Sequence, residues 1–388
     1  MNIKRLIEFI IIFLLILDTG SIPSVFFSGG VISVCVIILS FLYCTIYGCG
    51  ISRSQLILLV GFSLFFILSS VFTHTSVLNY ISIIIRIIAV VLVFSVFNNK
   101  TQYLQDTLTK VLKFVAYLGA INYILINFFP FLFSLRSAEG GFSINTFLYF
   151  FNFHSYIQIG PFSLLRNQGM FWEPGVFQIP MNLLLYLLLI VKQKTLLQAI
   201  LPIVMVISTF STTGLIVMSL IIFFKTIRNK KSIPRIDKFI LIIFILILMP
   251  LVYENVNQKL TGDSSESAAA RTFDLYMGMD VIVNNPIWGI GPNPEKYITL
   301  TKDLDIGIYD NEINSERGNT NTIISFICYL GIPFSFYFFR MLYRQRIFPQ
   351  KKLFFMILII MLFSEPLFGT AILFLISMSA KLNKDYYM

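Results

Sequence analysis

The most regular feature of the sequence is a series of apolar runs separated by short polar breaks. A helix of roughly 17 to 25 mostly apolar residues crosses the ~30 Å hydrocarbon core of a bilayer. A β-barrel would instead show short alternating segments, so helices are the predicted spanning form. We predict an all-α integral membrane protein with about twelve transmembrane helices. The predicted spans cover residues 6–24, 30–47, 55–72, 80–97, 111–133, 176–191, 196–211, 213–227, 239–254, 320–339, 353–363 and 366–380.

Composition and charge agree with a bilayer as the solvent. The chain is 57% hydrophobic and 12% charged, and its mean hydropathy is +0.82, which is too apolar for a soluble globule. The net charge of +10 does not indicate nucleic acid, because the basic residues cluster in the polar breaks at 2–5, 225–238 and 340–352. Such clusters mark cytoplasmic loops. Both termini are therefore predicted to be cytoplasmic, and the first apolar run is predicted to be an uncleaved span.

Two breaks, 134–175 and 255–319, are much longer than the others and fall on the predicted outer face. Loops of this length in a tightly looped protein are usually functional. In the first, residues 142–162 are too aromatic for a solvated linker and too broken for a span, which favours a segment at the membrane interface. Its rings could stack on sugars or could simply anchor the interface. In the second, we predict a helix that opens near residue 263 or 264 and ends at Asn284-Asn285-Pro286.

Two charged residues stand just before the span at 176–191. Arg166 can direct two hydrogen bonds onto a phosphate near the headgroups, although an arginine here can also be an interfacial anchor. Glu173 lies between Trp172 and Pro174. A carboxylate packed against aromatic rings is a candidate general base, but it can equally be a helix-start carboxylate that favours the helix dipole.

Further charges lie along the second loop and within the spans. Arg271 is in the predicted helix of that loop, with Asp274 on the same face, so a local ion pair is the alternative to a binding role. Arg317 precedes the span at 320–339 as a third outer cation. Glu365, at the turn between the last two spans, could pair with one of these arginines. Arg86 lies within a span, where a charge should face the bundle interior.

We predict no metal and no other cofactor. His74 and His154 are the only histidines, and they form no pattern typical of metal ligands. Asp303-Leu304-Asp305 resembles the metal motif of nucleotide-sugar enzymes, but it lies in an outer loop. The glycines of 286–294 lack the Lys-Ser/Thr ending of a nucleotide-binding loop, so this segment is predicted to be a rigid turn. The four cysteines show no metal or disulfide spacing.

Taken together, residues 166–178, 271–294 and 319–332 resemble bacterial O-antigen polymerases of the Wzy type and the related O-antigen ligases. The Trp-Glu-Pro-Gly-x-Phe-Gln stretch at 172–178 is typical of the polymerase branch. The resemblance implies a metal-independent glycosyltransferase with a GT-C-like helical membrane fold and two large periplasmic loops. It also implies a bacterial inner membrane and substrates that are oligosaccharides linked to undecaprenyl diphosphate.

The resemblance also assigns roles to residues. In such enzymes outer-loop arginines hold the lipid diphosphate, which corresponds to Arg166 and Arg271 here, with Arg317 as a further candidate. Glu173 is the candidate base for the acceptor hydroxyl. The predicted substrate-binding set is completed by Trp172, Asn321 and Glu365. The expected partners are the lipid-linked oligosaccharide, membrane lipid and a chain-length regulator protein, and no nucleic acid is expected.

Two other functions remain as alternatives. O-antigen ligases carry a histidine just before the span that follows the second large loop, whereas this chain has Gly318-Asn319-Thr320-Asn321 there. That difference favours a polymerase. A repeat-unit flippase would also have about twelve spans, but flippases generally have short loops and charges within the bundle. Here the charges concentrate in two long outer loops.

Overall fold

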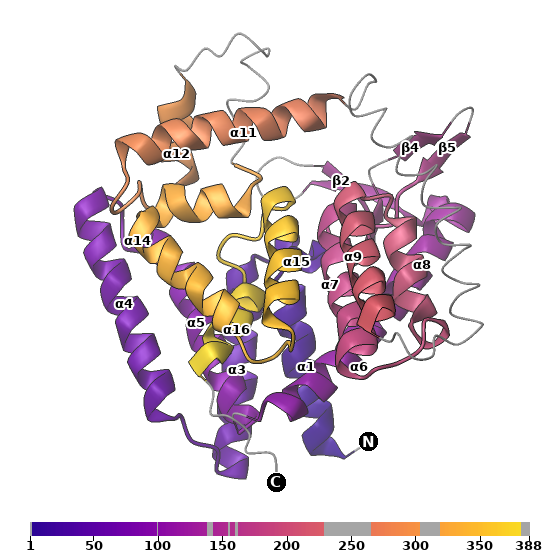
Figure 1. Cartoon of the computed structure of the whole chain (residues 1–388), viewed down its shortest axis with the longest axis horizontal. Coiled ribbons are helices and arrows are strands. Elements are labelled where there is room, and N and C mark those ends of the chain that lie inside the picture. The colour runs from indigo at the N-terminus through magenta and orange to yellow at the C-terminus, as the bar shows by residue number, and fades with distance from the viewer. Residues whose placement is uncertain are drawn as a thin grey trace. The chain divides into compact units, whose positions relative to one another are not determined.

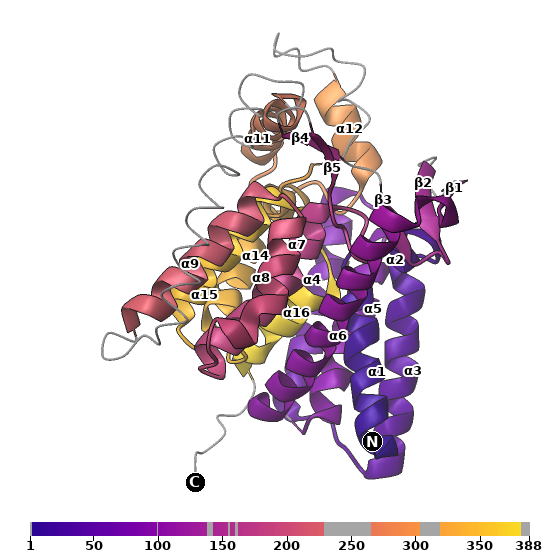
Figure 2. The ribbon, with the colours of Figure 1, turned by 90° about the vertical axis from the view of Figure 1, so that its right-hand side faces the viewer.

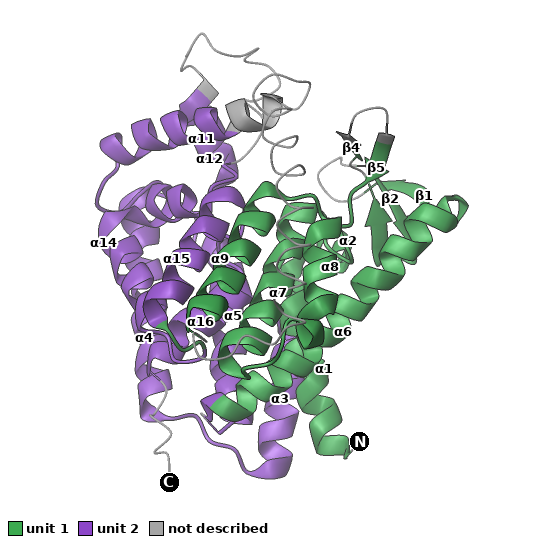
Figure 3. Cartoon of the chain, turned by 45° about the vertical axis from the view of Figure 1, so that its right-hand side comes forward, with its two compact units in different colours: residues 1–32, 102–262, 348–350 green, residues 33–101, 263–347, 351–388 purple. Residues whose placement is uncertain are grey.

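The computed structural model describes residues 2–98, 100–137, 143–153, 156–159, 162–228, 265–302 and 319–381. The chain divides into two compact units (Figure 3). Unit 1 comprises residues 1–32, 102–262 and 348–350, and unit 2 comprises residues 33–101, 263–347 and 351–388. Most of the described residues are helical, as the apolar runs predict.

Six of the described helices are long and apolar enough to cross a membrane, which indicates a membrane protein. Each overlaps a predicted span, although Thr101–Phe128 begins ten residues before the predicted span 111–133. Every other predicted span within the described ranges contains a shorter helix, and the span at 239–254 lies outside them. The count of about twelve spans therefore stays a prediction. The six helices are Gly29–Tyr47, Arg53–Thr73, Leu78–Val96, Thr101–Phe128, Pro174–Val191 and Thr322–Arg344.

In unit 1, the helix α7 (Pro174–Tyr186) is the most deeply buried element. Proline at its first position suits a helix start because that position needs no N–H donor, and every residue of the helix is buried. It packs against α8 (Ile200–Ser208) and α9 (Thr212–Arg228), and it runs on into the π-helical turn η2 (Leu187–Val191). The remaining helices of the unit are α1 (Ile3–Leu17), α2 (Ile22–Phe26), α6 (Thr101–Phe128), and the 3-10 turns η1 (Pro130–Leu132) and η3 (Leu197–Ala199).

The first long loop contains five short strands, which the sequence reading did not predict. Three form an antiparallel sheet in the order β1-β2-β3, with Arg136 opposite Ile144 and Thr146 opposite Asn152, and two form a hairpin. Figure 2 shows β1 to β3 beside α2. Runs such as Ser-Ile-Asn-Thr-Phe contain β-branched and aromatic residues, a strand signal that the high aromatic content of the segment obscured. The strands are β1 (Ser134–Ser137), β2 (Ser143–Phe147), β3 (Phe151–Phe153), β4 (Tyr156–Ile159) and β5 (Phe162–Leu165).

Unit 2 is built around α14 (Thr322–Arg344), which is interrupted at Gly331. Gly331 has φ 76° and ψ 167°, and Pro333 follows it inside the helix. The helix packs against α11, α15 and α16, and α16 in turn packs against α5. The helix α11 ends at Asn284, as predicted, and it runs across the direction of α4 (Figure 1). The other elements are α3 (Gly29–Tyr47), α4 (Arg53–Thr73), α5 (Leu78–Val96), α11 (Ser265–Asn284), α12 (Pro294–Lys302), α15 (Lys351–Ser364), α16 (Ala371–Met378) and η4 (Ser379–Lys381).

Candidate functional site

In unit 1, the segment 166–173 forms a turn that leads into α7, and the junction between α1 and α2 holds it in place. The N–H of Ile22 donates to the carbonyl of Met170 at 2.8 Å, and the N–H of Trp172 donates to the carbonyl of Gly20 at 3.1 Å. A β-bridge joins Ser21 to Phe171. Main-chain pairing with a distant part of the chain therefore fixes the course of the backbone into α7.

Three fully buried asparagines tie the same turn to α6, β3 and α8. The Nδ2 of Asn167 donates to the Gly119 carbonyl at 3.2 Å and to the Ser208 hydroxyl at 3.0 Å, and its Oδ1 accepts the Gly169 N–H at 2.9 Å. Asn122 exchanges two hydrogen bonds with the main chain of Asn152, each 3.2 Å long. The Asn152 side chain donates to the Phe171 carbonyl at 2.8 Å. Each amide therefore bonds the buried turn, or the strand beside it, to main-chain groups of the surrounding elements.

Close packing around Phe177 explains two glycines of this unit. Gly169 has φ +57°, and a Cβ there would lie 2.8 Å from the Phe177 ring. A Cβ at Gly119 would lie 2.3 Å from the same ring. The glycine of the Arg-Asn-Gln-Gly stretch is therefore needed both for its left-handed conformation and for the space that its missing side chain leaves.

The structure brings the predicted residues Arg166, Trp172 and Glu173 together in this one turn. The Nε of Arg166 donates to the carbonyl of Thr209 at 3.0 Å, so the half-buried guanidinium has a fixed orientation. Glu173 is the N-cap of α7, in extended conformation and partly exposed, and its side chain makes no capping hydrogen bond. Glu173 therefore occupies the predicted helix-start position without bonding to the free N–H groups of α7.

In unit 2, the stretch just before α14 is bonded to α11. The N–H of Thr320 donates to Oδ2 of Asp274 at 3.0 Å, and the Thr320 hydroxyl donates to the same oxygen. Asn319 donates to the Asp274 carbonyl at 2.7 Å. No ion pair joins Asp274 to Arg271 among the residues that the structure describes, so the alternative of a local ion pair does not account for Arg271.

Asn321 and Glu365, both predicted to bind substrate, are buried at 4% and 3% exposure. The Oδ1 of Asn321 caps α14 by accepting the N–H groups of Ile323 and Ile324 at 3.0 and 3.2 Å. The hydroxyl of Thr322 donates to the carbonyl of Glu365, which places the turn between α15 and α16 beside the start of α14. The structure thus gives Asn321 a structural role and places Glu365 in the same part of unit 2.

The predicted rigid turn after α11 docks onto the interruption in α14. The N–H groups of Ile290 and Gly291 donate to the carbonyls of Cys328 and Tyr329 at 2.8 and 3.0 Å. The N–H of Ile332 donates back to the Pro286 carbonyl at 2.8 Å. The bonds that the break removes from the helix are therefore replaced by bonds to the turn, so the buried main-chain groups at the break have partners. The sequence predicted the turn but not its partner.

Tyr297 is a residue of this network that the sequence reading missed. It lies on α12, is 3% exposed, and its hydroxyl oxygen accepts a hydrogen bond from Asn319 Nδ2 at 3.0 Å. Burial raises the pKa of Tyr297 above its usual value, and the bond from Asn319 only partly offsets this. The phenol is therefore neutral and keeps its proton as a donor. In the sequence, nothing distinguished this tyrosine from the apolar residues next to it in a polar loop.

Several predicted features lie outside the described residues, namely Arg317, His154 and the Asp303-Leu304-Asp305 motif. Arg166, Trp172 and Glu173 belong to unit 1, whereas Arg271, Asn321 and Glu365 belong to unit 2. Within the described ranges, no group of three or more His, Cys, Asp or Glu residues could hold a metal ion.

Comparison with known proteins gives one match. A family model described as O-antigen ligase matches residues 197–317, a range that includes α8 and α9 of unit 1 and α11 and α12 of unit 2. This match supports the superfamily of O-antigen polymerases and ligases, and it does not distinguish one from the other. No curated protein and no solved structure matched the chain.

Proposed function

We propose that this chain is a polysaccharide polymerase of the O-antigen type. The family match indicates a polymerase- or ligase-type function in polysaccharide assembly, carried out by a glycosyltransferase-like enzyme. The single observation that favours a polymerase is the stretch before α14. Where ligases carry a histidine, Asn319 and Thr320 are bonded to α11 and Asn321 caps α14. This stretch offers no group that could act as a proton acceptor.

The proposed donor is an oligosaccharide linked to undecaprenyl diphosphate, and the acceptor is a repeat unit on its own lipid carrier. An acceptor hydroxyl attacks the anomeric carbon of the donor, and the bond from that carbon to the diphosphate oxygen breaks. The diphosphate leaves with the electron pair. Attack from the opposite side inverts the anomeric centre. We place the reaction on the periplasmic face of the inner membrane, with both termini in the cytoplasm.

Arg166 and Arg271 are the proposed phosphate ligands. Negative charge develops on the leaving diphosphate in the transition state, and guanidinium groups fixed beforehand stabilise it without a metal ion. The bond from Arg166 Nε to the Thr209 carbonyl supports this role, because it orients the guanidinium before substrate arrives. Arg271 lies in the range that the family model matches. Removal of one such donor typically costs about 10²- to 10³-fold in rate.

Glu173 is the proposed base that accepts the proton of the acceptor hydroxyl. It is partly exposed at the start of α7, and it is not engaged as a helix cap. Loss of a positioned general base typically costs about 10²- to 10⁴-fold. Glu173→Gln keeps the shape of the side chain and removes the base, so it should abolish polymer growth while the protein stays folded.

The test is a gel of surface lipopolysaccharide from a strain that lacks the gene. The strain is complemented with wild type, Arg166→Ala, Arg271→Ala or Glu173→Gln at equal protein levels. Wild type should restore a ladder, and the three variants should leave core plus one repeat unit. Arg136→Ala is the matched control, because Arg136 is exposed on β1 of the first loop and its guanidinium lies over the Tyr149 ring. This control should give a full ladder.

The same gel separates the alternatives. Bare core in the deletion strain indicates a ligase or a flippase instead, because a polymerase defect leaves one repeat unit attached to the core. Arginine variants that restore a full ladder would overturn the diphosphate-binding roles. A full ladder with Glu173→Gln would show that Glu173 is not the base and that its role is limited to the start of α7.

A further inference from the structure

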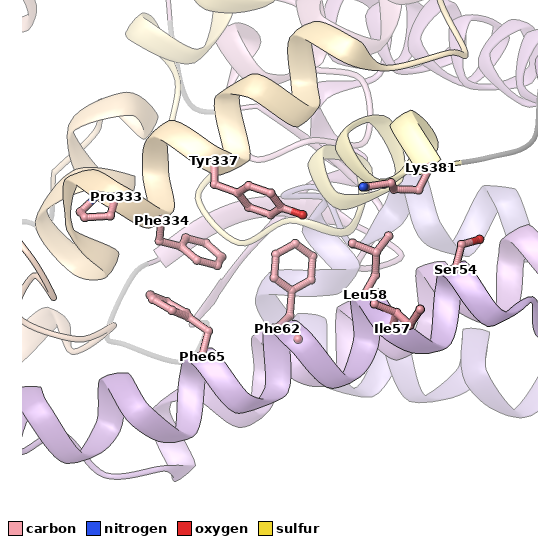
Figure 4. Close-up of a pocket in the computed structure, with 10 residues that line it drawn as sticks. Ser54, Ile57, Leu58, Phe62, Phe65, Pro333, Phe334, Tyr337 and Lys381 are labelled. Carbon is pink, nitrogen blue, oxygen red and sulfur yellow. The ribbon is translucent and has the colours of Figure 1, made fainter.

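Unit 2 contains an apolar groove between α4 and α14 (Figure 4). The groove has a volume of about 580 Å³, and it is lined chiefly by Ile57, Leu58, Phe62, Phe65, Phe334 and Tyr337. Gly61 also lines the groove, and a Cβ added there would meet no atom within 4 Å. The position of Gly61 therefore leaves open space for a ligand rather than allowing close approach of another helix.

A second cavity, of about 550 Å³, adjoins the groove, since both are lined by Tyr337 and Lys381. It lies at the C-terminal end of α14, where the helix gives way to the turn before α15. Five cations converge on it, namely Arg340, Arg344, Arg346, Lys351 and Lys381. No acidic residue is among its lining residues, and none of the five cations has an ion-pair partner in the part of the chain that the structure describes.

This arrangement goes beyond what a cytoplasmic basic loop requires. The bias of lysine and arginine toward one side of a membrane explains how many cations are present, but not why they surround one cavity. Arg340 and Arg344 are four residues apart on α14, where like charges repel. The turn that carries Arg346 is held in place, because the Arg346 N–H donates to the Ser379 hydroxyl at 3.0 Å. A bound anion would relieve the repulsion.

We propose that the groove and the basic cavity together bind one anionic phospholipid. One of its acyl chains lies along Phe62 and Phe65, and its phosphate lies among the arginines. Charge complementarity selects an anionic headgroup, and the adjoining apolar groove selects a lipid over a soluble anion. The site is at the opposite end of α14 from Asn321, so it is separate from the residues that we assign to catalysis, and it does not depend on that assignment.

The test is native mass spectrometry of the full-length protein in neutral detergent. The probes are dioleoyl phosphatidylglycerol and dioleoyl phosphatidylcholine, which share acyl chains and differ in net charge. Phosphatidylglycerol, the anionic lipid of the two, should be retained preferentially. Replacement of Arg340, Arg344 and Arg346 by Gln should weaken its retention about 100-fold, since each cation near an anionic surface contributes roughly fivefold. The charge control is Lys110→Gln with Lys113→Gln, two exposed lysines on α6, which should keep wild-type retention.

A second variant tests the groove. Gly61→Phe should fill the open space and lower retention of both lipids, whereas Val60→Phe adds the same ring at an exposed neighbour outside the groove lining and should not. Circular dichroism of each variant confirms that it is folded. Three results would overturn the proposal. They are competition by free glycerol phosphate as strong as by the lipid, equal loss with the α6 control, and unchanged retention in Gly61→Phe. A dimer that Gly61→Phe dissociates would assign the groove to a second copy of the chain.

Discussion

The two candidate segments are held in place by different means. In unit 1, the turn at 166–173 is held by buried side-chain amides, above all those of Asn167 and Asn152, in addition to main-chain bonds with residues 20–22. In unit 2, the turn at 285–291 is held by main-chain bonds to α14, which requires glycine at Gly289 and Gly331. The first arrangement relies on particular buried amides in addition to main-chain bonds, whereas the second relies mainly on main-chain bonds and on glycines that allow the close approach. The two units should therefore respond to substitution in different ways.

Arg166 and Arg271 also differ in how their side chains are held. The Arg166 guanidinium is bonded to a main-chain carbonyl within its own unit. Arg271 is a partly exposed residue of α11, and no hydrogen bond or ion pair joins its side chain to another described residue. One arginine is thus positioned by the fold, whereas the side chain of the other has no such bond to the described residues. Stability should depend on the first far more than on the second.

The largest expected effect comes from Gly331→Ala. A Cβ at Gly331 would lie 2.0 Å from the Ile287 carbonyl oxygen, and its φ of +76° already disfavours a side chain. Strain and overpacking together should cost at least ~4 kcal/mol. Gly369→Ala is the control, because φ there is +72° but the nearest atom is at 3.6 Å. Thermal unfolding in detergent should show a loss for Gly369→Ala limited to about 1 to 3 kcal/mol. Equal losses would mean that the docked turn is not what makes Gly331 necessary.

Asn167→Ala should have the next largest effect, because it removes the buried bonds to the Gly119 carbonyl and the Ser208 hydroxyl and the acceptor of the Gly169 N–H. We expect a loss of about 3 kcal/mol in the free energy of unfolding. Asn127→Ala is the matched control on α6, where the exposed side chain bonds only to the carbonyl one turn earlier. A loss no greater than that of the control would remove the basis for treating unit 1 as held by its amides.

Thr320→Val tests a side-chain contribution in unit 2. The variant keeps the shape of the residue and the N–H bond to Asp274 but loses the hydroxyl bond. A loss of about 1 to 2 kcal/mol is expected, because the carboxylate loses one charge-assisted bond. Thr299→Val on α12 removes only an exposed bond within its own helix. Equal stability of the two variants would show that main-chain bonds suffice in unit 2.

The smallest effect on stability distinguishes the two arginines. Arg166→Lys removes the Nε donor to the Thr209 carbonyl and should lower stability by about 1 kcal/mol, whereas Arg271→Lys should change it by less than ~0.5 kcal/mol. Both should lose polymer growth, because an ammonium cannot replace a two-pronged guanidinium at a phosphate. Calorimetry alongside the ladder assay measures both. Equal stability losses would contradict the difference in how the two residues are held.

The sequence was informative where one periodicity dominated and silent where contacts joined distant segments. Apolar runs predicted the positions of α4, α5 and α14, and Asn284-Asn285-Pro286 predicted the end of α11. The strands of the first loop were missed because their aromatic residues suggested an interfacial segment. The bonds from Asn319 and Thr320 to α11 were beyond prediction, because each joins residues 45 or more positions apart. Gly331 and Pro333 were visible signals of a break, but the turn that fills it was not.

The proposed polymerase activity is tested directly by a reaction of the purified full-length protein with undecaprenyl-diphosphate-linked repeat units. The reaction is run in detergent with a metal chelator and without lipid A-core. The products are resolved by gel and by mass spectrometry. If the protein is a polymerase, wild type should form lipid-linked chains of increasing length and release undecaprenyl diphosphate. Arg166→Ala and Arg271→Ala should each lose the longer chains and the released diphosphate. A contradictory result is that no longer product forms until lipid A-core is added, and that the oligosaccharide is then transferred to it. That result would identify a ligase instead of a polymerase.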